Sequence, residues 1–411
     1  MDYPIIISAI VLGITLLVFT LGKSPVFRVD RAGVAIIGAT AVIAAGILTF
    51  NQATQSIDFR TIVLLFSMMI VTANLKLAGF FQLIGNMLLK NTKSQKQLLF
   101  IVIMITGLLS AFFINDIVCL LFTPIVILIC KRAEINPIPY AIGVATASNI
   151  GSAATLIGNP QNILIGSLSH LGFFQYCRLA FPLSIIGLFL NYYFIVWIFH
   201  KELQGNISAR PQLEGGYHQY LIGKSLLTML VIAVGFLAGV DTVMVASLGA
   251  GYLLMTRRLK PNKVYASIDF NLLVIFCGLF IIMAGVEHSG LMKWFLRELD
   301  FLNFKQFSVF SILTVLLSNI FSNVPAVLLL KFLIPAGTGE SWWAGMAIFS
   351  TIAGNLTLTG SMANLIVAES AKREGVKISF FDYLKVGLPL TLILCLICFG
   401  YLTIFHFHPA S

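Results

Sequence analysis

The chain has 411 residues, of which 58% are hydrophobic and only 10% are charged, and its mean hydropathy is +0.96. This composition excludes a soluble globular domain. Apolar stretches of about 18–22 residues recur along the whole chain, and each is long enough to cross a hydrocarbon core of ~30 Å. The formal net charge of +10 comes from short basic clusters between these stretches, a pattern that indicates membrane topology and not a nucleic-acid-binding face.

The first half begins with three expected spans, at about 4–22, 32–50 and 59–75, followed by an interfacial amphipathic segment that ends near Lys90. A long apolar run then covers 98–130 and carries the polar pair Asn115-Asp116 in its middle. One helix of that length would overshoot the bilayer, and lysines flank both ends of the run. We therefore expect a re-entrant hairpin whose tip is Asn115-Asp116, because non-helical backbone at this depth requires protein or a water-filled cavity around it.

The next apolar run, at 139–169, is interrupted at Asn149–Ser152 and again at Gly158–Asn162. Proline removes a backbone donor and glycine weakens a helix, so we expect a discontinuous span made of two half-helices. A span at about 179–199 closes this half, and a polar cytoplasmic linker follows at 201–217.

The second half repeats this plan. Val29-Asp30 returns 211 positions later as Val240-Asp241, and Ser56–Phe59 returns at the same distance as Ser267–Phe270. We expect spans at about 220–239, 242–256 and 268–286, a hairpin at 307–335 with Asn323 at its tip, a broken helix at 342–371 and a last span at 381–405. The predicted fold is an all-α polytopic membrane protein of two repeats, 1–200 and 218–411, each with five spans and a re-entrant hairpin. An odd number of spans inverts the second repeat, which is typical of secondary transporters.

Basic clusters orient the chain by the positive-inside rule. Most of the 26 Lys and Arg can face the cytoplasm together, and both termini then lie outside. The clusters assigned to the cytoplasm are Lys23/Arg28/Arg31, Lys90/Lys93/Lys96, Lys131/Arg132, Lys201/Arg210/Lys224, Arg257/Arg258/Lys260/Lys263 and Lys372/Arg373/Lys377/Lys385.

The two hairpin tips and the two helix breaks are expected to meet near the midplane. A break exposes N–H groups that favour anions and carbonyl groups that suit hard cations. Amides and hydroxyls are costly in lipid, so their density here indicates a polar cavity, with helix capping and interhelical hydrogen bonding as the alternative. We expect the substrate to be bound by Asn115, Thr155, Asn162, Asn323, Pro325, Thr359 and Asn364. We expect the coupling ion, with Na⁺ as the candidate metal, to be bound by Asp116, Asn149, Ser152, Asn159, Ser322, Asn355 and Ser361.

Two of these segments carry a resemblance. Leu109–Asp116 and Ser148–Asn162 resemble the hairpin and the broken helix of the ion transporter superfamily. That superfamily includes arsenite/antimonite efflux permeases, NhaD-type sodium/proton antiporters, citrate–metal symporters and divalent anion/sodium symporters. The resemblance implies an elevator-type carrier, usually a homodimer, and is closest to bacterial anion permeases.

The chain also departs from its relatives. The dicarboxylate branch has Ser-Asn-Thr at both tips, whereas only Asn115 and Asn323 match here. The arsenite branch shares the Asn-Asp tip but has an acid where Asn159 stands. Losing that acid weakens the case for an antiporter with two carboxylates.

Individual charged residues have competing interpretations. Asp116 either couples a cation or proton to transport or caps the second helix of the hairpin, and the first is favoured for an ionisable residue at membrane depth. Asp30 and Asp241 stand at matching span starts, where helix capping explains them. Lys331 is expected to extend towards the interface.

The sequence favours an ion-coupled secondary transporter of a small anion, either an inorganic oxyanion or a carboxylate, in the inner membrane. Arsenite or antimonite efflux and Na⁺/H⁺ exchange are the alternatives. No HExxH motif, nucleophile elbow or Walker motif occurs, so we expect neither an enzyme nor an ATP-driven pump. We expect no cofactor besides the coupling ion, Na⁺ or H⁺, and no nucleic-acid partner.

Overall fold

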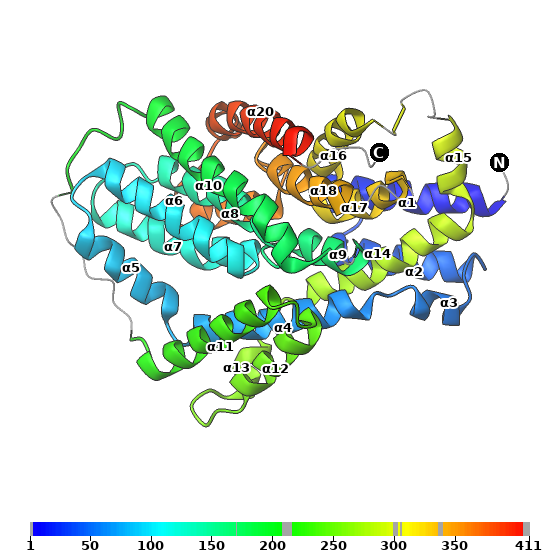
Figure 1. The fold of residues 1–411 in the computed structure, drawn as a ribbon, viewed down its shortest axis with the longest axis horizontal. Helices are drawn as coiled ribbons and strands as arrows, with labels where there is room; N and C mark the ends of the chain where they lie inside the picture. Colours follow the sequence, from blue (N-terminus) through cyan, green and yellow to red (C-terminus); the bar gives the residue numbers. More distant parts are fainter. Residues whose placement is uncertain are drawn as a thin grey trace.

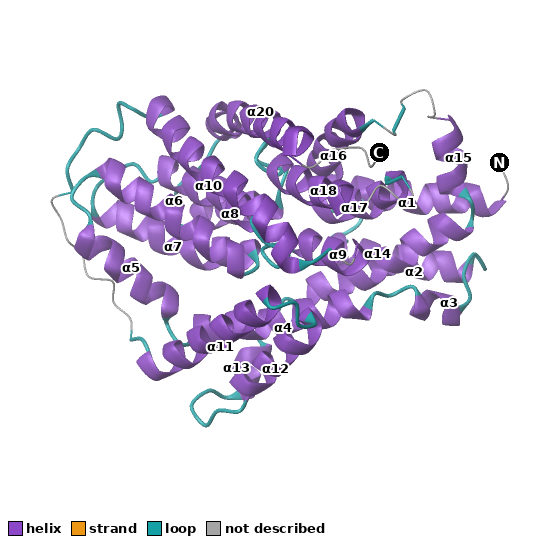
Figure 2. Ribbon diagram, in the orientation of Figure 1, coloured by secondary structure: helices purple, strands orange, loops and turns teal. Residues whose placement is uncertain are grey.

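The computed structural model describes residues 3–169, 171–207, 216–298, 303–304, 306–335 and 340–405. Within these ranges the protein is all-helical, as predicted, and the ribbon contains helices and loops but no strand (Figure 2). Part of the predicted linker, 208–215, lies outside the described residues.

The first half contains ten α-helices in the described ranges (Figure 1). They are α1 (Tyr3–Leu21), α2 (Arg31–Ala44), α3 (Phe50–Gln55), α4 (Phe59–Leu77), α5 (Phe80–Asn91), α6 (Gln95–Phe112), α7 (Asn115–Arg132), α8 (Ile138–Ser152), α9 (Pro160–Ser169) and α10 (Phe173–Ile198).

In the described ranges, the second half contains the same succession of α-helices and also a 3₁₀ turn. They are α11 (Gln219–Leu237), α12 (Thr242–Leu254), α13 (Pro261–Tyr265), α14 (Phe270–His288), α15 (Leu291–Glu298), α16 (Phe307–Phe321), α17 (Asn323–Leu330), η2 (Lys331–Leu333), α18 (Glu340–Ala353), α19 (Met362–Arg373) and α20 (Phe380–Phe405).

Seven of the described helices are long and apolar enough to cross a membrane, namely α1, α4, α6, α10, α11, α14 and α20. Helices α2 and α12 are apolar but have only 14 and 13 residues, which is shorter than the ~20 of a straight spanning helix. The predicted span at 32–50 was therefore too long, because the chain turns at Gly46 and begins a separate helix, α3, at Phe50. Helix α10 begins at Phe173 and not near 179, since Gly172 and not the internal Pro182 sets its start.

Packing partners are exchanged between the halves. Helix α2 packs on α14, and its counterpart α12 packs on α4; α7 packs on α19, and α17 packs on α9. Helices α10 and α20, which occupy the same place in the two halves, pack on each other. This reciprocal pattern is what an approximate two-fold axis between the halves produces. The orientation of that axis in the membrane stays a prediction.

Small residues bring the helices of the two halves close together. A Cβ atom on Gly278 of α14 would lie 2.7 Å from the backbone of Ala35 in α2. At the matching α4–α12 contact, the hydroxyls of Ser67 and Ser247 are 3.2 Å apart and hydrogen-bonded. Such contacts drive helix association in lipid, where burial of apolar surface contributes little.

Asp30 and Asp241 cap α2 and α12, as predicted. Each carboxylate accepts a hydrogen bond from a backbone N–H of the first helical turn, from Gly33 at 2.8 Å and from Met244 at 2.9 Å.

Candidate functional site

A cavity of about 370 Å³ lies where the two hairpin tips meet the starts of both second half-helices. The first tip contributes Asn115 and Asp116, at the start of α7. The second tip contributes the run from Ser322 to Pro325, at the start of α17. Pro160 and Gln161 of α9 and Ser361 and Met362 at the start of α19 complete the part of the wall built by the helix breaks.

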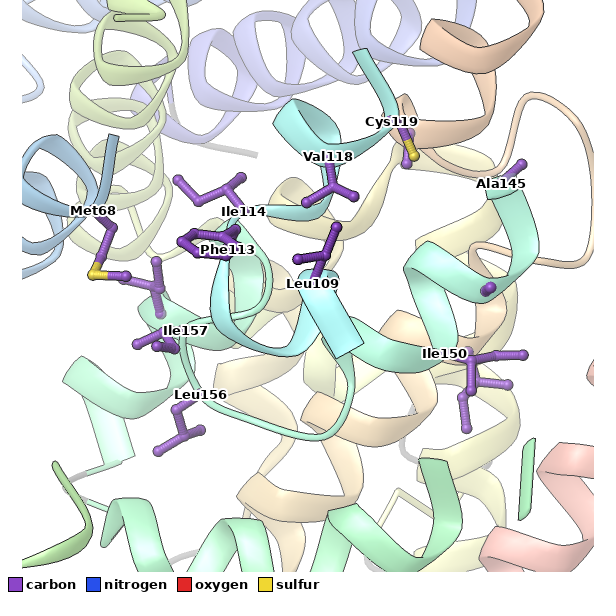
Figure 3. Close-up of a cluster of buried hydrophobic side chains, with 14 of the residues drawn as sticks. Met68, Leu109, Phe113, Ile114, Val118, Cys119, Ala145, Ile150, Leu156 and Ile157 are labelled. Carbon is purple, nitrogen blue, oxygen red and sulfur yellow. The ribbon is translucent and has the colours of Figure 1, made fainter. Parts of the chain in front are cut away.

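The first tip is held by an apolar shell (Figure 3). Phe113 and Ile114, which join α6 to α7, are buried and belong to the same hydrophobic cluster as Met68 of α4 and Ile157 of the first helix break. The backbone N–H of Asn115 donates to the carbonyl oxygen of Gly158 at 2.9 Å. The tip therefore packs inside the protein, against the first helix break.

Gly158 is required by this contact, because a Cβ atom there would lie 2.4 Å from the backbone oxygen of Ser152. Only glycine allows the break to approach both the hairpin and the end of α8 so closely.

Behind the cavity, a network of amides and hydroxyls connects the two breaks. Asn149 lies at its centre. Its Oδ1 accepts hydrogen bonds from Asn115 Nδ2 at 3.2 Å and from Ser361 Oγ at 3.1 Å. Its Nδ2 donates to the Oδ1 atoms of Asn355 and Asn364, at 2.9 and 3.0 Å. These side chains are buried, and each bond joins different helices or a helix to a break.

Asn162 and Asn364 hold the two breaks in the same way. Asn162 Nδ2 donates to the carbonyl oxygens of Ser152 and Thr155, at 3.3 and 3.0 Å. Asn364 Nδ2 donates to those of Gly354 and Thr357, at 2.6 and 3.1 Å, which are again 10 and 7 residues earlier. Each asparagine thus satisfies the carbonyl groups that the end of a half-helix leaves free.

This correspondence defines the register of the repeats at the breaks. Asn162 matches Asn364, so Asn149 matches Thr351 and not Asn355, which lies four residues further along the chain. The bonds across the axis agree, since Asn149 Nδ2 donates to Asn364 while Thr351 Oγ1 donates to Asn162 Oδ1 at 3.2 Å.

The predicted site residues fall into two groups. Six of them line the cavity: Asn115, Asp116, Ser322, Asn323, Pro325 and Ser361. The others do not line it, and most hold the breaks from behind: Asn149, Ser152, Thr155, Asn159, Asn162, Asn355, Thr359 and Asn364. Among these, the Thr155 hydroxyl already donates to the carbonyl of Ala111 and accepts from the N–H of Ile157.

Five polar residues that line the cavity were not among the predicted ligands: Asp30, Arg31, Gln161, Asp269 and Asn271. Arg31 was counted in a basic cluster between spans, whereas in the structure it is 9% exposed and lines the cavity. A usable signal existed for Arg31, which opens an apolar span whose counterpart opens with the uncharged Thr242.

Charge in the cavity is mixed. Asp116 is half-buried and lies within electrostatic range of Arg31 and of Asp269. Asp30 also lines the cavity while it caps α2. One guanidinium therefore shares the cavity with three carboxylates, so Asp116, which has no basic neighbour in the sequence, has a cationic one in the structure.

A second cavity of about 220 Å³ lies beside Arg60 and Asp241, which match Asn271 and Asp30 of the first cavity at the 211-residue spacing of the repeat. It is lined by Arg60 at the start of α4 and by Asp241 in front of α12. The Arg60 side chain donates to the Asp241 carboxylate, and this hydrogen bond lowers the pKa of Asp241 below its usual range.

Comparison with known proteins agrees with this architecture. The chain is 27% identical to the rice "Silicon efflux transporter LSI3", over 95% of this chain and 96% of that one. It is 27% identical to the "Putative transporter arsB" of Dictyostelium discoideum, over 90% and 86%, and 28% identical to a "46 kDa membrane protein" of Mycobacterium leprae, over 93% and 96%.

The crystal structure of the Alcanivorax borkumensis YdaH transporter, described as having an unusual topology, superimposes with a TM-score of 0.56 at 15% sequence identity and covers 98% of both chains. This likeness shows the fold alone.

The family profile CitMHS, described as "Citrate transporter", matches residues 14–344. Together with the apolar helices, this match identifies a multi-pass membrane protein, and the chain belongs to the CitMHS family of transporters.

Proposed function

We propose that the protein is an ion-coupled secondary active transporter that carries a small anion, either an inorganic oxyanion or a carboxylate, by alternating access. The observation that carries this proposal is the cavity in which both hairpin tips and both half-helix starts meet. Its place between the halves is where carriers with inverted repeats bind their substrates.

The cavity offers groups for both ions. Helix starts favour an anion by about 0.3–1 kcal/mol each, up to ~2 when partly buried. Asp116 and the Asn115 Oδ1 atom, which has no hydrogen-bond partner in the described part of the chain, offer hard oxygen ligands to a cation. An anion that entered alone would meet more carboxylates than guanidinium groups. Coupled entry of Na⁺ or H⁺ removes that repulsion, which supports coupling.

The movement that we propose is of the elevator type. The hairpins, the half-helices and the network behind the cavity would move together past α1, α2, α4, α11, α12 and α14. A homodimer in the inner membrane, with both termini outside, completes the proposal. The family description "Citrate transporter" supports a carboxylate as the anion.

Efflux of arsenite or antimonite is a second candidate, and Na⁺/H⁺ exchange a third. The excess of carboxylates over Arg31 favours the second candidate, because a neutral hydroxylated solute donates hydrogen bonds to carboxylates. The names of the arsB and silicon efflux relatives also support it.

Reconstituted vesicles distinguish these functions. Uptake of citrate, sulfate and arsenite should be measured with a Na⁺ gradient, with a pH gradient and with neither. The proposal predicts gradient-driven uptake of an anion, and Asp116→Asn should abolish that uptake or uncouple it from the gradient. Gradient dependence that is unchanged in Asp116→Asn would remove Asp116 from the coupling mechanism, and arsenite as the sole transported solute would favour the second candidate.

A further inference from the structure

The guanidinium of Arg31 is buried in the cavity with donors to spare. Its Nε and Nη2 atoms donate to the carbonyl oxygen of Phe19, at 3.1 and 2.8 Å, and its Nη1 atom contacts the sulfur of Met362. A guanidinium has five N–H donors. The described contacts use three of them, and no described carboxylate oxygen lies within 4.0 Å of the group. A buried guanidinium without a paired anion costs free energy, and binding of an anion in the cavity would reduce that cost.

The second hairpin tip presents unused donors to the same cavity. Ser322 has φ 72° and ψ 156°, a conformation that residues other than glycine avoid and that costs about 1–3 kcal/mol. In the first turn of α17, Pro325 has no N–H and Ala326 donates to the Ser322 carbonyl oxygen at 3.2 Å. The N–H groups of Asn323 and Val324 have no acceptor among the described residues. They lie at the positive end of the helix.

The first hairpin tip differs from the second in its hydrogen bonding and in its charge. The backbone N–H of Asn115 is occupied by Gly158, and its side-chain amide donates to Asn149. Its neighbour Asp116 adds a negative charge to this side of the cavity. The two tips therefore match in position but not in charge, and an anion would be attracted to the second tip and repelled by the first.

We propose that Arg31 and the free amides of Asn323 and Val324 form the subsite for the anionic group of the substrate, while Asp116 faces the coupling cation. The planar fork of Arg31 suits a carboxylate or another oxyanion, to which it can donate two parallel hydrogen bonds. This assignment rests on the proposed anion transport and replaces the expected role of Ser322 as a cation ligand. Ser322 instead directs the α17 amides into the cavity.

Binding by purified full-length protein in detergent tests the subsite. Citrate, succinate, sulfate and phosphate serve as probes, and the rise in melting temperature with probe concentration gives an apparent affinity. Na⁺ is titrated separately. For whichever anion stabilises the wild type, Arg31→Gln should weaken binding at least about tenfold, because charged hydrogen bonds are lost. Na⁺ should bind Arg31→Gln as tightly as the wild type or more tightly, since a competing positive charge near Asp116 is gone.

Two further variants complete the design. Arg31→Lys keeps the charge but loses the fork, so anion affinity should fall between the wild type and Arg31→Gln; this variant decides the matter if Arg31→Gln does not fold. Arg60→Gln is the matched control, because Arg60 occupies the second cavity and already pairs with Asp241. It should bind the anion as the wild type does.

The outcomes separate this inference from the function on which it rests. Anion affinity that is unchanged in both Arg31 variants would overturn the subsite and leave anion transport standing. A wild type that responds to none of the four anions would overturn the proposed function, and the subsite with it. Parallel loss of anion and Na⁺ binding in Arg31→Gln would show a structural role for Arg31 and would also overturn the subsite.

Discussion

Removal of the Asn149 side chain is expected to loosen the junction between the two halves more than removal of any single-bonded asparagine. Asn149→Ala deletes two accepted and two donated hydrogen bonds, all between 2.9 and 3.2 Å long. It also leaves buried amide groups of Asn355 and Asn364 without their donor. Interhelical hydrogen bonds in membranes are worth about 0.6 kcal/mol on average and up to about 1.7. For four bonds, we therefore expect the free energy of unfolding to fall by about 2–7 kcal/mol.

Asn74→Ala is the matched control. Asn74 is as deeply buried, at 2% exposed, but its amide makes only one described hydrogen bond, to the Ile70 carbonyl of its own helix at 2.9 Å. We expect a loss of about 1 kcal/mol for this variant. Both variants, purified in the same detergent, should be compared by thermal unfolding. Melting temperatures that are equal for Asn149→Ala and Asn74→Ala would refute the central role of Asn149.

A double-mutant cycle makes the same argument more specific. Asn149 donates to Asn364 across the two breaks at 3.0 Å, so Asn149→Ala and Asn364→Ala should not be additive. We expect a coupling free energy of about 0.5–1.7 kcal/mol between these two sites. Strict additivity would mean that this hydrogen bond does not contribute to stability.

Three further predictions concern the tips, one glycine and the topology. Asn115→Ala and Asn323→Ala should each reduce uptake into vesicles at least about tenfold. Only Asn115→Ala should also lower the melting temperature, because Asn323 has no side-chain hydrogen bond among the described contacts; wild-type uptake in both would exclude them as ligands. Gly158→Ala should lower the melting temperature by several degrees, because its Cβ would lie 2.4 Å from a backbone oxygen, whereas alanine at a glycine that faces open space should not. In a background without the six native cysteines, Lys96→Cys and Gln306→Cys should react with a membrane-impermeant thiol reagent from opposite faces, and reaction of both from one face would contradict the inverted repeats.

The sequence predicted the helix order well because hydropathy is a local signal and the repeat can be read from the sequence without knowledge of packing. The segments 98–130 and 307–335 each contain two α-helices, and the segments 139–169 and 342–371 are each interrupted by an irregular stretch. Bounds were wrong where hydropathy continued through a turn, as in the apolar stretch before Phe50. Asn115 and Asn323, which line the cavity, could be singled out in the sequence because each is a polar residue in the middle of an apolar run.

The membership of the cavity could not be predicted to the same extent, because it depends on tertiary packing. Arg31 contacts Met362 of α19, and α19 packs on α7, the helix of Asp116. Nothing in the 84 positions between Arg31 and Asp116 indicates this. Conversely, Asn162 and Asn364 were expected to bind substrate, yet their amide nitrogens are occupied by backbone carbonyls. A polar residue in a break can either line the cavity or hold the break in place, and the residue type does not distinguish these roles.

The frame around the cavity and the cavity itself differ in symmetry, and a coupled carrier needs both properties. The bonds from Ser361 to Asn149 and from Asn159 to Thr351 are equivalent under exchange of the halves, at 3.1 Å each. Two matching halves allow two conformations of similar free energy, between which bound ions can shift the population. Arg31 and Asp116, by contrast, have no charged counterparts in the other half, where Thr242 and Val324 stand. The unmatched charges allow the cavity to bind an anion and a cation at different places. The matched hydrogen bonds around it allow inward-facing and outward-facing conformations of similar free energy.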